Sequence, residues 1–271
     1  MKESLWKIKK YGAFTIFFIV LSIVLFILLI VPIFNIMFQE NPIVLFDTLF
    51  TDYVAAAIMT SFYCSFLSTV LAVCLGIPLG YLLARYNFPG KRIVDSIVDL
   101  PILIPHSVAG ILLLATYGQQ GFLGQFFSNF GVSFYDTPWG IVIAMFFVSS
   151  PFLIKGARDA FENVNPNVEK AARTLGASRS RTFLTITLPI ASRGIFTGSI
   201  LCWARGISEF GAVYILASTP LIGSVLVYFE FQGSGLSAVR PIAIVLILVT
   251  LVIFVCLKLI QGKSRPVTRV S

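Results

Sequence analysis

Two charged residues, Arg205 and Glu209, lie four positions apart inside an otherwise apolar stretch of the sequence. In a helix this spacing places both on one face, and charges within a membrane segment usually face a bundle interior or an aqueous path and pair with each other. One interpretation is that the two residues line or gate a route along which Arg205 attracts an anion. The other is that they form a structural ion pair at a helix or dimer interface.

The other candidates for proton or metal chemistry are isolated from one another. His106, the single histidine, titrates near neutral pH, but without a chain of membrane carboxylates a packed polar residue is the favoured interpretation. Asp95 and Asp99 have the spacing of carboxylates that bind diphosphates. Only one such pair occurs and Lys91 and Arg92 lie one turn away, which favours a local ion-paired interface.

No pattern for nucleotide or metal binding is present in the sequence. The four cysteines lie in apolar segments without C-x-x-C spacing, so neither a disulfide framework nor a zinc site is predicted. Neither G-x-x-x-x-G-K-[ST] nor G-x-G-x-x-G occurs, so the usual cradles for a nucleotide phosphate are missing. We expect no enzyme activity, no catalytic residue, no metal and no cofactor, and any ATP that drives this protein must be bound by another chain.

The composition is that of a membrane protein, since 57% of the 271 residues are hydrophobic and 12% are charged. Soluble domains average about 45–50% and about 25%. The first apolar stretch follows several lysines, but it is too long for a secretory signal and is interpreted as a retained helix. Six transmembrane helices are predicted, approximately at 13–37, 54–84, 99–118, 138–157, 193–217 and 241–261.

The net charge of +8 reflects the topology of the chain rather than a nucleic-acid site. All of the 20 Lys and Arg residues except Arg205 and Arg240 lie in the N-terminal segment, in the connections 85–96 and 155–193, or at the C-terminal end. The positive-inside rule makes this side cytoplasmic, so both termini are expected in the cytoplasm of a multi-pass protein of the cell membrane. Nucleic acid is not expected as a partner.

Two further features of the membrane segments are predicted from helix breakers. Gly76, Pro78 and Gly80 favour a kink or tilt near the cytoplasmic end of the long second span. The stretch 119–134 is rich in glycine and aromatic residues and is expected to form a short interfacial helix and loop facing outward.

The cytoplasmic segment 155–193 is the least hydrophobic part of the chain. Asn165 followed by Pro166 is typical of a helix start, and Gly176 is placed where that helix would end in a left-handed residue. A second amphipathic turn from Arg179 leads to Pro189 and the fifth span. Two short helices joined by small residues predict a compact knob that another protein can grip.

At these residues the sequence resembles permease subunits of ATP-binding cassette (ABC) importers. The cytoplasmic loop of that family carries E-A-A-x-x-x-G, nine further residues, and then I-x-L-P. The residues at the matching spacings are Ala171, Ala172, Gly176, Ile186, Leu188 and Pro189. The first motif position, usually Glu, is Lys170 here, with Glu169 one residue earlier, so the family's ion pair from that Glu to the ATPase is not carried over.

The resemblance implies that the loop 158–190 couples this chain to an ABC ATPase, with Glu169, Lys170 and the six matching residues as the coupling residues. The competing interpretation is an amphipathic helix lying on the membrane surface, which Arg173, Arg179 and Arg181 would suit. It does not account for the spacing through Leu188 and Pro189.

Two further segments narrow the resemblance to permeases for molybdate, tungstate and sulfate. They are D-L-P-I-L-I-P-H-S-V-A-G in the third span and A-R-G-I-S-E-F-G-A-V in the fifth, and the likeness extends over about residues 53–261. It implies an all-α, six-helix permease of the type I importer (MetI-like) architecture that carries molybdate or tungstate. The implied partners are a second copy of the chain, two ATPase subunits, an extracytoplasmic oxyanion-binding protein and the lipid bilayer, and Pro105, Arg205 and Glu209 are the implied path or gate.

The expected organisation has three parts. Residues 1–52 form a cytoplasmic segment, the first span and an outer loop, residues 53–261 form the permease core, and residues 262–271 form a cytoplasmic tail. The alternatives are an importer for sulfate or another oxyanion and an ion-coupled secondary transporter, which calls for several intramembrane carboxylates and inverted repeats. A membrane-embedded enzyme would need a catalytic cluster that the spans do not supply.

Overall fold

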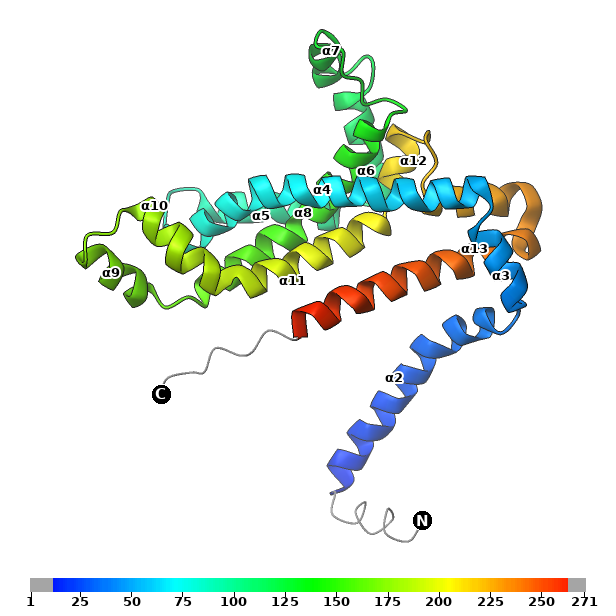
Figure 1. The fold of residues 1–271 in the computed structure, drawn as a ribbon, viewed down its shortest axis with the longest axis horizontal. Coiled ribbons are helices and arrows are strands. Elements are labelled where there is room, and N and C mark those ends of the chain that lie inside the picture. The colour runs from blue at the N-terminus through cyan, green and yellow to red at the C-terminus, as the bar shows by residue number, and fades with distance from the viewer. Residues whose placement is uncertain (1–11, 263–271) are drawn as a thin grey trace.

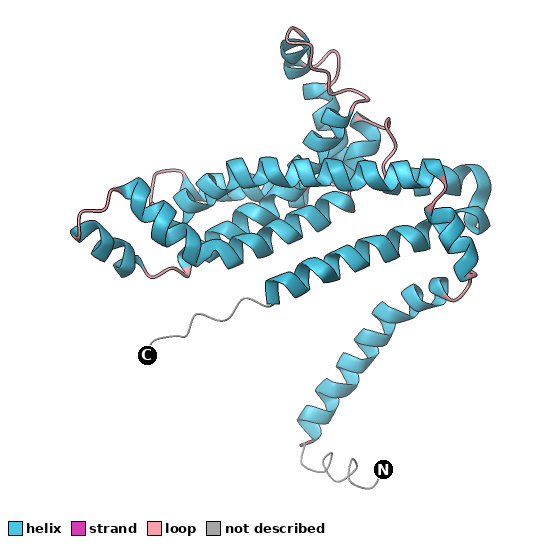
Figure 2. Ribbon diagram, viewed as in Figure 1, coloured by secondary structure: helices cyan, strands magenta, loops and turns pink. Residues whose placement is uncertain are grey.

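The computed structural model describes residues 12–262, and this part of the chain is helical throughout, with short connecting loops and no strand (Figures 1 and 2). The N-terminal lysines and the tail after residue 262 lie outside the described residues. The helices are α2 (Ala13–Met37), α3 (Pro42–Leu49), α4 (Asp52–Arg85), α5 (Lys91–Leu103), α6 (His106–Tyr117), α7 (Phe122–Ser128), α8 (Pro138–Glu162), α9 (Pro166–Thr174), α10 (Arg179–Thr182), the π-helix η1 (Phe183–Thr187), α11 (Leu188–Ile207), α12 (Gly211–Leu216) and α13 (Gly223–Gly262).

Five segments of the described chain are long and apolar enough to cross a membrane, and the bent pair α5–α6 brings the number to six. The predicted all-α fold with six spans is therefore confirmed. Helix α2 has the predicted bounds, and α4 extends the predicted 54–84 by two residues at its start and one at its end. The short helix predicted within 119–134 is α7.

Helix α8 forms the centre of the bundle and packs along both α4 and α11. Close approach depends on glycines at the crossings, as is common between membrane helices. A Cβ atom at Gly80 would lie 3.0 Å from the Ala157 Cβ atom, and one at Gly156 would lie 2.8 Å from the Gly198 Cα atom. Helix α4 continues through Pro78, and Gly76 and Gly80 on either side of it pack against α8.

The prediction of one continuous helix over 99–118 is wrong. Helix α5 ends at Leu103, α6 begins at His106, and the two axes are bent by 111°. Ile104 has an extended backbone (φ −76°, ψ 132°), the conformation favoured by a residue that precedes proline. Hydropathy did not reveal the break because the segments on both sides of it, apart from His106 and Ser107, are mostly apolar.

The prediction of one helix over 193–217 is also wrong. Helix α11 starts earlier, at Leu188, and ends at Ile207, after which the chain turns at Ser208–Phe210 into the short α12. A buried carboxylate, Glu209, provides a hydrogen-bond acceptor for the backbone of α12, so the turn is stabilised by a side chain that hydropathy scores only as a charge.

The last span differs from its prediction in a similar way, because α13 is bent at Gly235, whose φ of 76° is left-handed. The predicted segment 241–261 belongs to the part that follows this residue. At the start of the chain, α2 diverges from the bundle (Figure 1) and is joined to it by α3 and by an ion pair of 3.2 Å between Glu40 and Arg240. This pair accounts for one of the two basic residues outside the group that is predicted to be cytoplasmic.

Candidate functional site

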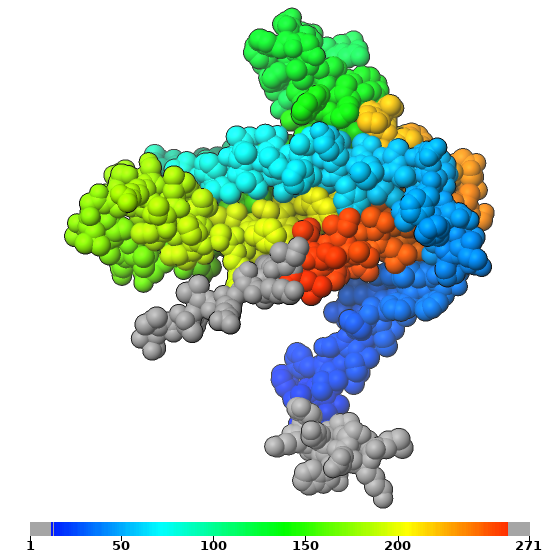
Figure 3. Space-filling view, in the orientation of Figure 1, coloured from blue at the N-terminus to red at the C-terminus, as the bar shows by residue number. Residues whose placement is uncertain are grey.

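Most of the predicted site residues form two separate groups in the fold, and Ile186, Leu188 and Pro189 lie between the knob and the membrane bundle. One group lies in the knob made by α9 and α10 (residues 165–182), at one end of the molecule (Figure 3, yellow-green). The other lies where the break between α5 and α6 meets the break between α11 and α12, and is called the joint below.

The knob is built by local capping interactions, as predicted. The Asn165 side chain accepts a hydrogen bond of 2.9 Å from the Asn167 N–H, and Pro166 occupies the first turn of α9. Gly176 has a left-handed backbone with φ 89°, and Ser178 caps α10 through the Arg181 N–H at 3.2 Å. Two helices thus reverse direction within a few residues.

The outer surface of the knob carries four of the eight predicted coupling residues. Lys170, Ala171 and Gly176 are exposed and Ala172 is half-buried. Leu175 is 88% exposed, beside the reversal at Gly176. An apolar side chain this exposed at the tip of a basic knob is suited to a socket on another protein.

Glu169 points the other way, into the chain's own structure. Its Oε1 atom accepts hydrogen bonds from Arg85 Nη2 at 2.9 Å, Arg85 Nε at 3.1 Å and Thr187 Oγ1 at 3.0 Å. Arg85 Nη2 also donates to the Val164 carbonyl at 2.8 Å. The side chains of Arg85 and Glu169 are only 11% and 15% exposed. We call these four residues, Arg85, Val164, Glu169 and Thr187, the clamp.

Sequence reasoning did not single out Arg85 and Thr187. Arg85 ends an apolar span and was counted only as a topology signal, and Thr187 occupies the variable position of I-x-L-P. A basic residue that closes a span, followed much later by an acidic residue at the start of a cytoplasmic helix, is the one signal that could have suggested the pair.

The I-x-L-P motif lies where the knob enters the membrane bundle. Ile186 belongs to η1, while Leu188 and Pro189 begin α11, so the chain runs helically from Arg179 to Ile207 with one π segment. π segments are rare and are frequent at functional sites. The Phe183 ring packs against that of Tyr81 at a centroid distance of 4.8 Å, which fixes the base of the knob against α4.

The joint is centred on Glu209, whose side chain is 1% exposed. Its Oε2 atom accepts from Arg205 Nη2 at 2.7 Å, and its Oε1 atom accepts from the Ala212 N–H at 2.9 Å. The predicted pairing of Arg205 with Glu209 is confirmed, but Glu209 lies beyond the end of α11 rather than on its face. The Glu209 carbonyl accepts from Ser224 Oγ at 2.6 Å, which ties the joint to α13.

His106 and Pro105 belong to the same joint. Pro105 precedes α6, and the His106 Nε2 atom lies 2.9 Å from Arg205 Nη2, which as a guanidinium can only donate, so the ring nitrogen accepts. The His106 side chain is 50% exposed, so it is a partner of Arg205 at a surface rather than a packed interior residue. Sequence reasoning treated His106 and Arg205 separately because they lie far apart in the chain.

Asp95 and Asp99 form the predicted ion-paired interface, with different partners. Asp95 pairs with Arg158 at 2.9 Å and Asp99 with Lys155 at 2.7 Å, both on α8, rather than with Lys91 and Arg92. The two pairs fasten α5 to the half of α8 that leads into the knob.

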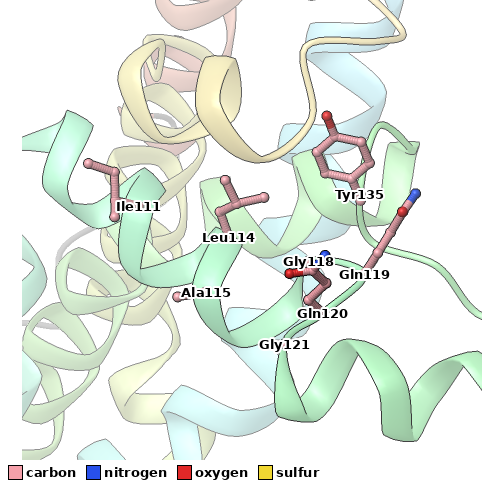
Figure 4. A pocket seen from close by; sticks show the side chains of 8 residues that line it. All are labelled: Ile111, Leu114, Ala115, Gly118, Gln119, Gln120, Gly121 and Tyr135. Carbon is pink, nitrogen blue, oxygen red and sulfur yellow. The ribbon is translucent and has the colours of Figure 1, made fainter.

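A pocket of about 610 Å³ is formed by α6, the loop 118–121 that leads to α7, and Tyr135 (Figure 4). Figure 4 shows Ile111 on one side of it and Gln119 with Tyr135 on the other. The residues that line it are Ile111, Leu114, Ala115, Gly118, Gln119, Gln120, Gly121 and Tyr135, none of which is charged. Within residues 12–262 no group of three or more His, Cys, Asp or Glu side chains is arranged to hold a metal ion.

Comparison with protein families gives a match over residues 76–270 to the model described as "Binding-protein-dependent transport system inner membrane component". Among curated proteins, the molybdate/tungstate transport system permease protein WtpB of Thermococcus kodakarensis is 47% identical, over 82% of this chain and 84% of its own length. The protein of the same name from Methanocaldococcus jannaschii is 38% identical over 93% and 98%. A probable sulfate transport system permease protein of Chlorokybus atmophyticus is 33% identical over 89% and 87%.

Among solved structures, a bacterial ABC transporter that imports alginate superposes with a TM-score of 0.74 at 20% identity, covering 97% of this chain and 100% of the other. The same kind of transporter, in complex with an alginate-pentasaccharide-bound periplasmic protein, superposes with a TM-score of 0.71 at 19% identity, covering 94% and 96%. At these identities the likeness concerns the fold.

Proposed function

Because the chain belongs to the family of binding-protein-dependent transport system inner membrane components, we propose that it carries molybdate or tungstate through the membrane for an ATP-driven importer. As a member of this family it is a multi-pass membrane permease component of an ABC importer and not a catalytic subunit. The cargo is proposed from the names of its relatives. The proteins named for molybdate/tungstate are 38–47% identical to it, and the sulfate permease is 33% identical.

The observation that carries the proposal is the knob. Its exposed Leu175, the left-handed Gly176 and the basic side chains of Lys170, Arg173 and Arg179 form a protruding surface of suitable size for a cleft on an ATPase subunit. In the proposed complex two copies of the chain each dock one ATPase through this surface. Ala171 and Ala172 allow close approach, while Ile186, Leu188 and Pro189 connect the docked knob to α11.

The substrate path is proposed to run between two copies of the chain. The distribution of basic residues supports a cytoplasmic position for the knob and both termini. The short α7 then faces outward, where the uncharged pocket beside it offers a surface to an oxyanion-binding protein. Closure of the ATPase pair would open the bundle outward to receive the anion, and reopening after hydrolysis would release it inward.

The joint is proposed as the gate of this path. Arg205 is held by Glu209 and His106, so its charge is nearly neutralised in this state, and Pro105 fixes the bend that places His106 there. A passing dianion competes with Glu209 for the guanidinium, which provides a transient attraction and not a tight site. The alternative is a purely structural ion pair that holds α12 against α11, and the same contacts support it. Uptake by an Arg205 variant distinguishes the two roles.

Co-expression with ABC ATPase subunits from the same genome tests the docking surface. Gly176→Trp adds bulk at the tip of the knob; no atom lies within 4 Å of a Cβ atom there, and the backbone strain of a side chain at φ 89° is reproduced in the control below. Gly131→Trp is a matched control, since Gly131 also has a left-handed backbone (φ 75°) and open space but lies beyond α7. We expect an ATPase to co-purify with wild type and with Gly131→Trp, and to be lost with Gly176→Trp.

Two results would contradict the proposed docking surface. If no ATPase co-purifies with the wild type, or if binding persists in Gly176→Trp, then the knob is not the docking surface. Only the first outcome, no ATPase with the wild type, would favour the ion-coupled carrier; the second would place docking on another surface of the chain.

A further inference from the structure

The clamp has no role in the docking surface described above, although it occupies the same loop. Glu169 is the acidic residue adjacent to the motif, yet its carboxylate is turned away from the exposed tip and is held by Arg85 and Thr187. All of these hydrogen bonds go to Oε1, so only the Oε2 atom of Glu169 could accept a hydrogen bond from another protein. Its contacts are therefore with the chain's own membrane helices.

The clamp joins four segments of the chain. Arg85 is the last residue of α4, Val164 lies in the turn after α8, Glu169 is in the first turn of α9 and Thr187 ends η1. One guanidinium donates through two nitrogen atoms to one carboxylate oxygen and also to a backbone carbonyl. A planar guanidinium presents these donors in a fixed fork, whereas an ammonium is a compact charge on a flexible stem with rotatable donors.

The surroundings of the clamp make it stiff. Thr187 is fully buried, and the aromatic rings of Tyr81, Phe161 and Phe183 pack against one another beside it. Hydrogen bonds to charged groups are stronger when water is excluded, and a buried charge left without its partner is costly. The helix α9 therefore moves only together with α4 and with the base of α11 unless the clamp opens.

We propose that Arg85, through Glu169 and Thr187, is the positioning residue that makes α9 and the membrane helices move as one body, so that motion of a docked ATPase reaches α4 and α11 together. This inference rests on the proposed function. Glu169 then acts inside the chain as the anchor of the coupling helix, and docking itself belongs to the exposed face with Leu175 and Gly176. Loss of the clamp leaves docking intact and uncouples hydrolysis from transport.

Three substitutions open the clamp, and all but Arg85→Gln, which shortens the side chain by two heavy atoms, leave the volume nearly unchanged. Glu169→Gln removes the charge, Arg85→Gln removes the fork of donors, and Thr187→Val removes one hydroxyl while keeping the shape. Thr187→Ser keeps the hydroxyl and serves as the conservative rescue. Glu40→Gln is a matched control, because the Glu40–Arg240 pair is similarly half-buried but lies at the other end of α4.

The first measurement needs no ATPase. Trypsin is added to the purified chain in detergent, and cleavage after Lys170 and Arg173, both within α9, is followed. A folded helix must open locally before it is cut, so the rate follows the population of the open form. We expect cleavage about tenfold faster in Glu169→Gln, Arg85→Gln and Thr187→Val, in line with the loss of hydrogen bonds to a charged group, and no change in Thr187→Ser or Glu40→Gln.

The second measurement uses the complex in vesicles, with the ATPase, an anion-binding protein and labelled tungstate. We expect the clamp variants to retain ATPase co-purification but to transport about tenfold fewer anions per ATP hydrolysed than wild type, whereas Thr187→Ser and Glu40→Gln keep the wild-type ratio. Unchanged cleavage rates, or an unchanged ratio of transport to hydrolysis, overturn the positioning role while docking stands. If even wild type recruits no ATPase, the proposed function fails and the coupling role fails with it, an outcome that the co-purification step separates from the other two.

Discussion

At the scale of single residues, the joint shows how one buried carboxylate can hold several elements in place. Glu209 receives a guanidinium from α11 and a backbone N–H from α12, and its carbonyl receives a hydroxyl from α13. A charge buried to this degree is tolerated only when it is paired and hydrogen-bonded. Removing Arg205 therefore leaves the buried Glu209 carboxylate without its positive partner and lowers the stability of the fold.

Arg205→Ala is expected to destabilise the chain by about 3 kcal/mol, because removing one partner strands a buried charge. The measurement is the thermal denaturation midpoint of the purified chain in detergent. The double variant Arg205→Ala/Glu209→Gln should recover much of this loss, since the remaining side chain is neutral and still offers an oxygen to the Ala212 N–H.

The same variants separate the gate from a structural pair. If Arg205 attracts the passing anion, the double variant stays folded and yet takes up anion more slowly than wild type. Uptake at the wild-type rate by folded Arg205→Ala protein would rule out the gate and leave the structural pair.

At the scale of the elements, the two broken helices are held together by close packing of α6 on α12. A Cβ atom at Gly110 would lie 2.8 Å from the Ile215 Cβ atom and 3.0 Å from the Gly211 carbonyl oxygen. These are backbone and Cβ neighbours that cannot swing aside. The pair α6–α12 therefore forms one unit that carries the joint.

Gly110→Ala is expected to destabilise the chain by about 1–3 kcal/mol, the usual cost of overpacking. Gly233→Ala is the control, because a Cβ atom at Gly233 in α13 would meet no atom within 4 Å. Alanine there should be neutral or stabilising by about 0.5–1 kcal/mol through its helix propensity. Equal denaturation midpoints for the two variants would contradict the tight α6–α12 contact.

The ion pairs between α5 and α8 are expected to contribute little stability, because both lie partly in solvent. Asp95→Asn should lower the stability by less than about 1 kcal/mol, and high salt should remove most of the difference from wild type. Denaturation at low and high ionic strength tests this. A large loss that salt does not alter would mean that the Asp95–Arg158 pair is buried in the assembled protein.

The elements that the sequence predicted well are those whose signals are local. Helix α2 is a single long apolar run, and α9 has its cap at Asn165 and its left-handed end at Gly176, so their bounds follow from nearby residues. The breaks at Pro105 and Ser208 were missed because hydropathy averages across them. The clamp was missed for a different reason, since Arg85 and Glu169 are brought together only by the packing of α4 beside α8 and α9.

At the scale of the whole molecule, the apolar surface and the charged surface lie on different parts of the fold. The large exposed hydrophobic side chains cover α2 from end to end and continue over the outer faces of α4 and α13, as a lipid-facing surface requires. The knob, with its arginines, closes one end of this body, and the α6–α7 projection rises from another side (Figure 3). This arrangement fits the proposal that an ATPase subunit binds the knob and moves the membrane helices from that end.

The central claim is that this chain moves an oxyanion only when an ATPase and a binding protein act on it. The most direct measurement is uptake of labelled tungstate or molybdate into vesicles that contain the chain and its ATPase, with the binding protein outside and ATP inside. We predict uptake that requires ATP, the ATPase and the binding protein together, that excess unlabelled molybdate suppresses, and that excess sulfate suppresses far less. Uptake driven by a proton or sodium gradient in vesicles without the ATPase would contradict the account.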